Sequence, residues 1–126
     1  MSKLTPELRQ MVEARANWRC EFCGIAQESE PFFRFHVDHV VARQHGGETV
    51  SGNLALACHF CNRHKGPNLA SINPLTGELV PLFHPRSDRW TEHFERVEDR
   101  IEGRTAVGRA TATLLCMNAP NRRALR

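Results

Sequence analysis

The 126-residue sequence contains no tyrosine and no apolar run long enough to cross a membrane. A membrane-spanning helix needs about 20 apolar residues in a row, so the sequence predicts no membrane span. The first residues, "MSKLTPELRQMV", also lack the apolar middle and small-residue cleavage site of a signal peptide. We therefore expect a cytoplasmic protein, in which thiols stay reduced and paired cysteines bind metal rather than form disulfides.

A strong excess of basic residues is lacking as well. The formal net charge is +3, from 17 Lys and Arg against 14 Asp and Glu. Nucleic-acid-binding domains are usually more basic, so charge alone identifies no partner. The length predicts one domain, residues 1–126, with a small core that would gain from a bound metal.

The N-terminal part, residues 1–19, has the pattern of a helix. Thr5 is a typical cap and Pro6 suits the first helical position, and we expect the helix to end near Trp18. After it, "FFRFHVDHVV" (32–41) reads as a strand because aromatic and β-branched residues dominate it. A second helix is expected from about His59 toward Ala70.

The last part, residues 71–126, is expected to contain a hairpin around Thr76-Gly77 and a helix capped by Thr105. Between them, "RWTEHF" and "DRIEG" fit either a strand or a helix. The end, "PNRRALR", reads as a basic surface tail, and Cys116, among leucines and a methionine, as a small core residue.

Four cysteines form two Cys-x-x-Cys motifs, "CEFC" at 20–23 and "CHFC" at 58–61. Each motif turns two sulfurs toward one point, and two motifs supply the four thiolates of a structural zinc. The spacing is longer than the 15–20 residues or so of a zinc ribbon, which we attribute to an inserted strand and loop. A redox pair is the weaker alternative. The predicted zinc ligands are Cys20, Cys23, Cys58 and Cys61.

Four thiolates leave zinc no open position, so any chemistry must use other residues. A second polar set remains, made of His36, Asp38, His39, Asn53, Asn62, His64 and Lys65. Neighbours in a regular strand face opposite ways, so Asp38 and His39 can share a site only if the strand ends there and the chain bends.

The motifs "VDHVVARQHGG", "NLALAC" and "CNRHKG" together resemble a His-Asn-His (HNH) endonuclease of the zinc-stapled ββα-metal type, also called His-Me finger. "PLTGELVPLFHPR", "RWTEHF", "GRAT" and "MN" are similar to the tail of small, stand-alone bacterial members. The resemblance implies an α+β fold. Residues 20–70 would form a ββα-metal core with a four-cysteine zinc knuckle, between an N-terminal helix and a C-terminal hairpin-plus-helix extension.

The resemblance also implies roles for single residues. His39 matches the general base, and Asn53 the asparagine that braces the loop carrying the base. Asp38 and Asn62 match the ligands of a catalytic divalent ion. Asn62 stands at the third motif position, which is His or Asn in the family, with His64 nearby as a possible substitute ligand. Lys65 matches a lysine common three positions after the third motif residue.

Such a site suits hydrolysis of DNA phosphodiester bonds. A neutral histidine with an ordinary pKa near 6.5 can accept a proton from water. Two oxygen ligands suit Mg²⁺ or Mn²⁺, which neutralise phosphate charge. By the resemblance, cleavage would leave 5′-phosphate and 3′-hydroxyl ends. His36, Arg63 and Lys65 are possible nucleic-acid contacts, and His45 is expected in a solvated loop.

Two other functions fit parts of the sequence. A non-catalytic zinc-dependent DNA-binding module would keep the four cysteines but has no use for Asp38 beside His39. A zinc deaminase, with its His-x-Glu and Pro-Cys-x-x-Cys motifs, is approached by "HVD" and "ACHFC" but would leave Cys20 and Cys23 without a role. The choice between DNA and RNA, and between monomer and homodimer, stays open.

Overall fold

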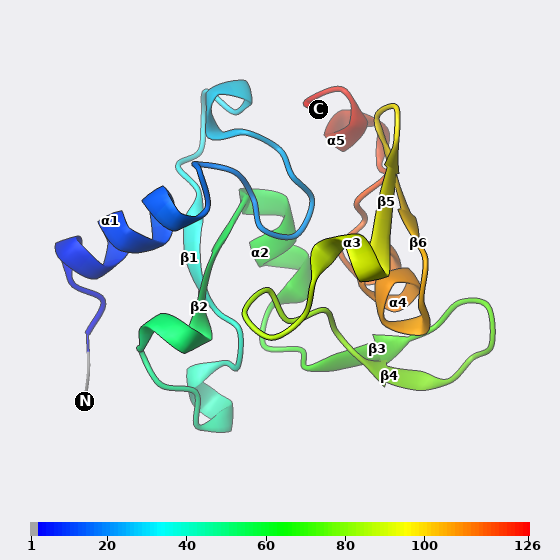
Figure 1. Cartoon of the computed structure of the whole chain (residues 1–126), viewed down its shortest axis with the longest axis horizontal. Helices are drawn as coiled ribbons and strands as arrows, with labels where there is room; N and C mark the ends of the chain where they lie inside the picture. Colours follow the sequence, from blue (N-terminus) through cyan, green and yellow to red (C-terminus); the bar gives the residue numbers. More distant parts are fainter. Residues whose placement is uncertain (1–2) are drawn as a thin grey trace.

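The computed structural model describes residues 3–126 of the chain, which form short helices and three two-stranded antiparallel sheets. Figure 1 shows α1 and the β1–β2 pair on one side of the molecule, α2 in the middle, and β3 to β6 with α4 on the other side. The elements are α1 (Pro6–Arg15), β1 (His36–His39), β2 (Leu54–Ala57), α2 (His59–Lys65), β3 (Ala70–Ile72), β4 (Leu79–Pro81), α3 (Trp90–His93), β5 (Phe94–Val97), β6 (Arg100–Gly103), α4 (Ala106–Leu114) and α5 (Pro120–Arg123), with 3-10 turns η1 (Gln27–Ser29), η2 (Arg43–His45) and η3 (Ser51–Asn53).

Helix α1 begins as its sequence predicts. The backbone N–H of Leu8 donates to Oγ1 of the cap residue Thr5 at 3.1 Å, and Pro6 takes the first helical position. The helix ends at Arg15, and Asn17 and Trp18 then adopt positive φ angles of 54° and 56°. This left-handed turn reverses the chain into the first Cys-x-x-Cys motif.

The centre of the molecule is a β-β-α unit. Strands β1 and β2 pair antiparallel, with His36 opposite Ala57 and His39 opposite Leu54. Helix α2 follows β2 after a single residue, Cys58, which caps it. Because β2 runs opposite to β1 and α2 then turns back, β1 and α2 run in the same direction side by side (Figure 1).

Both predicted elements of this unit are shorter than expected. The strand begins at His36 rather than Phe32, because the side chain of Gln27 takes backbone groups of Phe33 and Phe35 that a partner strand would need. Helix α2 ends at Lys65 because Gly66 has a φ of 50° and Pro67 follows it.

The C-terminal extension contains the predicted hairpin and helix, and a second hairpin. Strands β3 and β4 join through a turn in which the N–H of Gly77 donates to the carbonyl of Asn73 at 2.8 Å. The ambiguous segments form the short helix α3 and the hairpin β5–β6. Helix α4 begins at its predicted cap, where the N–H of Gly108 donates to Oγ1 of Thr105 at 3.0 Å. The α+β fold class is therefore confirmed.

Two predictions for the C-terminal part are wrong. The end of the chain is not a surface tail: Pro120–Arg123 form α5, and Arg122 is only 1% exposed. Cys116 is not a core residue but is exposed, because it follows α4 with a φ of 50° and turns the chain. The apolar interior is supplied by Leu115 and Met117 on either side of it.

One cluster of buried apolar side chains joins the N-terminal helix, the central unit and the extension. Its members include Val12, Phe22, Leu56, Phe94 and Leu115. Within residues 3–126, none of the helices has the length and apolar character needed to span a bilayer.

Candidate functional site

The two Cys-x-x-Cys motifs meet at one buried point. The sulfur atoms of Cys20, Cys23, Cys58 and Cys61 all lie within 4.8 Å of one another, and those of Cys23 and Cys58 are 3.7 Å apart. Zinc–sulfur bonds of about 2.3 Å in a tetrahedron place sulfurs about 3.8 Å apart. The four residues therefore fit a zinc ion, as the spacing of the motifs predicts.

Backbone groups position these sulfurs. In each motif the N–H of the second cysteine donates to the sulfur of the first at 3.4 Å, from Cys23 to Cys20 and from Cys61 to Cys58. Gly24, with a φ of 80°, closes the first motif by donating to the carbonyl of Cys20 at 3.0 Å. The second motif is the first turn of α2, so the metal would fix the start of this helix.

Arg122 is a part of this centre that sequence reasoning missed. Its guanidinium donates to the sulfur of Cys61 at 2.9 Å and lies 3.9 Å from that of Cys58. Four thiolates around Zn²⁺ carry two net negative charges, and this buried cation offsets one of them. No signal in "PNRRALR" distinguishes Arg122 from its neighbours, since the tertiary fold alone brings it to the cysteines.

This arrangement argues against a zinc deaminase. Such a site needs one His and two Cys around zinc and keeps a position open for water. Here all four sulfurs gather around one point, and all four cysteines are buried. Cys20 and Cys23 therefore belong to the four-sulfur cluster, whereas a deaminase site would leave them without a role.

A second site lies where β1 ends beside α2. A cavity of about 360 Å³ is lined there by Asp38, His39 and Asn62. Strand β1 ends at His39, so the alternation that would send Asp38 and His39 to opposite faces stops at this point. The other lining residues are Val37, Ala42, Arg43, Gln44, Gly66 and Pro67.

Asp38 offers this cavity a carboxylate that is only 6% exposed. Its Oδ2 atom lies 3.2 Å from Nζ of Lys65, which makes an ion pair by distance, yet Oδ2 has no well-aligned hydrogen bond within the described residues. Burial raises the pKa of Asp38, and Lys65 partly opposes this. A carboxylate that lines a cavity offers the kind of oxygen ligand that a hard cation such as Mg²⁺ prefers.

Lys65 occupies the buried side of the same site. It is 1% exposed, and besides Asp38 its Nζ atom lies 3.4 Å from the carbonyl oxygen of His39 and 3.5 Å from that of Gly66. This burial argues against the direct nucleic-acid contact that we considered for Lys65. The side chain instead holds Asp38 and the end of β1 against α2.

His39 is half-buried, and one ring nitrogen is already engaged. Its Nε2 atom lies 2.9 Å from Oγ1 of Thr49, a buried residue that the sequence did not single out. Burial lowers the pKa of His39, and the positive charges of Arg43 and Lys65 lower it further. The imidazole is therefore neutral at neutral pH and can accept a proton.

Asn53 ties together the loop between β1 and β2. Its Oδ1 accepts from the N–H of Val41 at 2.9 Å, and its Nδ2 donates to the carbonyls of Val41 at 3.0 Å and Glu48 at 2.9 Å. Gly47 permits this closure, because a Cβ atom there would lie 1.7 Å from the carbonyl oxygen of Val41. These bonds brace the loop that carries Thr49 and follows His39.

The remaining polar residues lie outside the cavity. His36 and Arg63 are exposed, on β1 and α2 respectively. His64 is exposed too, and its Nδ1 lies 4.0 Å from the sulfur of Cys116. Asn62, not His64, is therefore the residue of α2 that faces Asp38 and His39.

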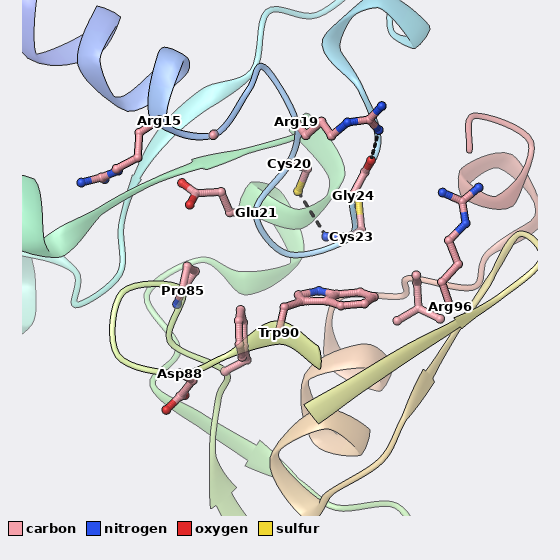
Figure 2. Close-up of a pocket in the computed structure, with 13 residues that line it drawn as sticks. Arg15, Arg19, Cys20, Glu21, Cys23, Gly24, Pro85, Asp88, Trp90 and Arg96 are labelled. Atoms are coloured by element: carbon pink, nitrogen blue, oxygen red, sulfur yellow. Dashed lines mark hydrogen bonds between the residues drawn. The ribbon is translucent and has the colours of Figure 1, made fainter. Parts of the chain in front are cut away.

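The cavity shown in Figure 2 is larger, about 450 Å³, but is built differently. It lies between the first Cys-x-x-Cys turn and the indole of Trp90, whose Nε1 donates to the carbonyl of Phe22 at 2.8 Å. Glu21, at its edge, accepts hydrogen bonds from Arg86 and from the N–H of Leu56. It lacks the histidine and asparagine of the site beside β1.

Comparison with known proteins agrees with this geometry. Neither the search of curated proteins nor that of solved structures found a match. Residues 20–68 match the family model described as HNH endonuclease, a segment that begins at the first zinc ligand and ends just after α2. The family acts on nucleic acid, which indicates a nuclease or DNA-binding function. These residues contain both sites described above, and their four clustered cysteines fit the zinc-stapled form of the HNH endonuclease domain.

Proposed function

We propose that the chain is a metal-dependent endonuclease that hydrolyses phosphodiester bonds of DNA and leaves 5′-phosphate and 3′-hydroxyl ends. The observation that carries this proposal is the cavity in which Asp38, His39 and Asn62 meet. A zinc-dependent DNA-binding module would need the cysteine centre but not this second group of residues.

Asp38 and Asn62 are the residues that would hold the catalytic divalent ion, Mg²⁺ or Mn²⁺. When bound, such an ion neutralises phosphate charge and stabilises the departing oxygen. The carboxylate of Asp38 and the amide of Asn62 line the same cavity, which supports this assignment. The cysteine centre would orient Asn62 indirectly, because Cys61 precedes it in α2.

His39 is the proposed general base. Thr49 holds its Nε2 atom, so Nδ1 is the ring nitrogen that would take a proton from the attacking water. The lowered pKa of His39 keeps this nitrogen unprotonated at neutral pH. Asn53 acts as a positioning residue, because it braces the loop that orients His39 and Thr49.

Basic side chains near the cavity would bind the substrate backbone. Arg43 lines the cavity, and Arg63 is exposed on α2 one residue beyond Asn62. Both would offer positive charge to the phosphates of a strand bound at the cavity. Their contribution would be seen as a salt-dependent affinity rather than as chemistry at the reacting phosphate.

Nicking of supercoiled plasmid in Mg²⁺ or Mn²⁺ tests the proposal. The wild type should nick the plasmid, His39→Ala should not, and both should hold zinc and unfold at similar temperatures. His45→Ala is the matched control, because His45 is exposed on the same loop and does not line the cavity. Products that a DNA ligase reseals directly would confirm the expected ends.

Binding without cutting would favour the DNA-binding module. If the wild type binds DNA under varied metals and salts but cuts neither plasmid nor single strands, the nuclease proposal fails. Nicking by His39→Ala at the wild-type rate would instead refute the role of His39.

A further inference from the structure

Two phenylalanines just before β1 are exposed. Phe32 is 85% and Phe33 47% exposed, although phenylalanine is normally among the most buried residues. Adjacent exposed aromatic rings on a small domain with few aromatics indicate a contact surface. We ask what this surface could bind, given its position.

Phe33 is held in a fixed orientation. Its ring stacks on the imidazole of His59 with centroids 4.3 Å apart and planes 9° apart. The side chain of Gln27 donates to the carbonyl of Phe33 at 3.0 Å and accepts from the N–H of Phe35 at 2.7 Å. The N–H of Phe32 donates to the buried side chain of Glu30 at 2.9 Å. The exposed rings therefore sit on a segment whose backbone is anchored.

This stacked pair adjoins the proposed catalytic cavity. β1 and α2 run in the same direction, so His36 and His59 lie together at their starts, with ring centroids 6.0 Å apart. Asp38 lies two residues after His36 on β1, and Asn62 lies about one turn after His59 on α2. Two residues of a strand span about 6.6 Å, so His36, which lies beside His59, is roughly one nucleotide spacing from Asp38, a proposed metal ligand.

The charge around the pair suits a nucleic-acid strand. Arg63 lies one helical turn from His59 on the same face of α2 and is exposed. A strand with its phosphate in the cavity would thus meet an arginine and a stacked aromatic pair in succession. Groups of this kind bind single-stranded nucleic acid through phosphate contacts and base stacking.

We propose that Phe33, stacked on His59, binds an unpaired base next to the phosphate that is cut. This inference rests on the proposed function and adds a substrate class: a strand that is single, or unpaired beside the cleavage site. Bases inside a duplex have both faces covered by their neighbours, so they cannot stack on a side chain without leaving the helix.

Binding of 2-aminopurine oligonucleotides tests this without any need for cleavage. We would use the full chain carrying His39→Ala, with one 2-aminopurine in a single strand and the same strand in a duplex. Stacking should quench the fluorescence of the single strand, which should bind more tightly than the duplex. Adding Phe33→Leu should abolish the quenching and weaken single-strand binding about tenfold, while Phe33→Trp should preserve both.

Leu75→Ala is the control for loss of an exposed apolar side chain, because Leu75 lies in the turn between β3 and β4. It should bind as the parent does. Zinc content and melting temperature show that each variant is folded. Equal binding of single strand and duplex, or no effect of Phe33→Leu, would overturn the inference.

Self-association that Phe33→Leu abolishes, with no change in single-strand binding, would also overturn the inference, because the surface would then bind a second copy.

Failure of this inference is separable from failure of the nuclease proposal. A wild type that nicks duplex plasmid but shows no quenching retains its function and loses only the stacking site. Quenching together with a wild type that cuts neither plasmid nor single strands would retain the stacking site and refute the nuclease proposal.

Discussion

At the scale of single residues, the protonation state of His39 depends on its burial and on the charges near it. His39 must be neutral to accept a proton, and burial, Arg43 and Lys65 all lower its pKa below the ordinary value of about 6.5. Lowering the pKa of a base extends its working range toward acid. The protein thereby keeps His39, the proposed general base, unprotonated under conditions in which an exposed histidine would be charged.

We therefore predict that the acid limb of the pH–rate profile, where cleavage slows because His39 becomes protonated, lies below pH 6.5 or so. As pH falls, His39 becomes protonated only near its lowered pKa, so activity persists further into acid than for an unperturbed histidine. Arg43→Gln removes one cause of the lowering and should move the limb to higher pH. Initial nicking rates measured across pH for both proteins check this. A limb that stays in place in Arg43→Gln would show that Arg43 does not tune His39.

Single residues also show how far sequence reasoning reaches. Asp38, His39 and Asn62 were predicted from their motif, and the structure places them in one cavity. Thr49 was missed, because a threonine in a glycine-rich loop carries no pattern that points to a histidine ten residues earlier. The position of Lys65 was missed for a related reason, since a lysine in "CNRHKG" reads as a surface residue until the packing of α2 buries it.

At the scale of elements, local signals were sufficient where local chemistry determines the structure. Thr5 and Thr105 cap the helices that they were expected to cap, because an N-cap depends only on residues a few positions away. The strand was predicted too long because its first residues bond to the side chain of Gln27. Helix α5 was missed entirely, because four residues give no periodic pattern and tertiary contacts hold it.

Helix α5 provides a test of its own. Arg122→Met keeps most of the length of the side chain but removes the donor to the sulfur of Cys61 and to the carbonyl of Leu115. Breaking such a buried charged contact should lower the free energy of unfolding by about 3 kcal/mol and speed zinc release to a chelator.

Arg123→Met is the matched control, because both side chains of its ion pair with Asp99 are partly exposed and solvent screens such a surface pair. Denaturant unfolding and the rate of zinc release to a colorimetric chelator would compare the two variants. Equal effects would show that α5 stabilises the chain without supporting the metal centre.

At the scale of the whole molecule, the four cysteines connect segments that are otherwise far apart in the chain. Cys20 and Cys23 follow α1, Cys58 and Cys61 begin α2, and Arg122 brings α5 to the same point. A chain of 126 residues has limited apolar area to bury, so a metal at this junction would support much of its tertiary structure. The working cavity in turn lies against α2, whose start that metal would fix.

The whole fold should therefore depend on zinc. Structural zinc in small sites binds with about 10–16 kcal/mol, which is comparable to the roughly 5–15 kcal/mol that stabilise an ordinary domain. Cys58→Ser should lose zinc and with it cooperative unfolding, and an excess of a strong zinc chelator should do the same to the wild type.

Cys116→Ser is the matched control, since Cys116 is exposed and lies outside the cluster. It should keep one zinc per chain and the wild-type melting temperature. Metal analysis and calorimetry on the two variants would decide, because a zinc-free Cys58→Ser protein that melts like the wild type cannot be reconciled with a metal-dependent fold.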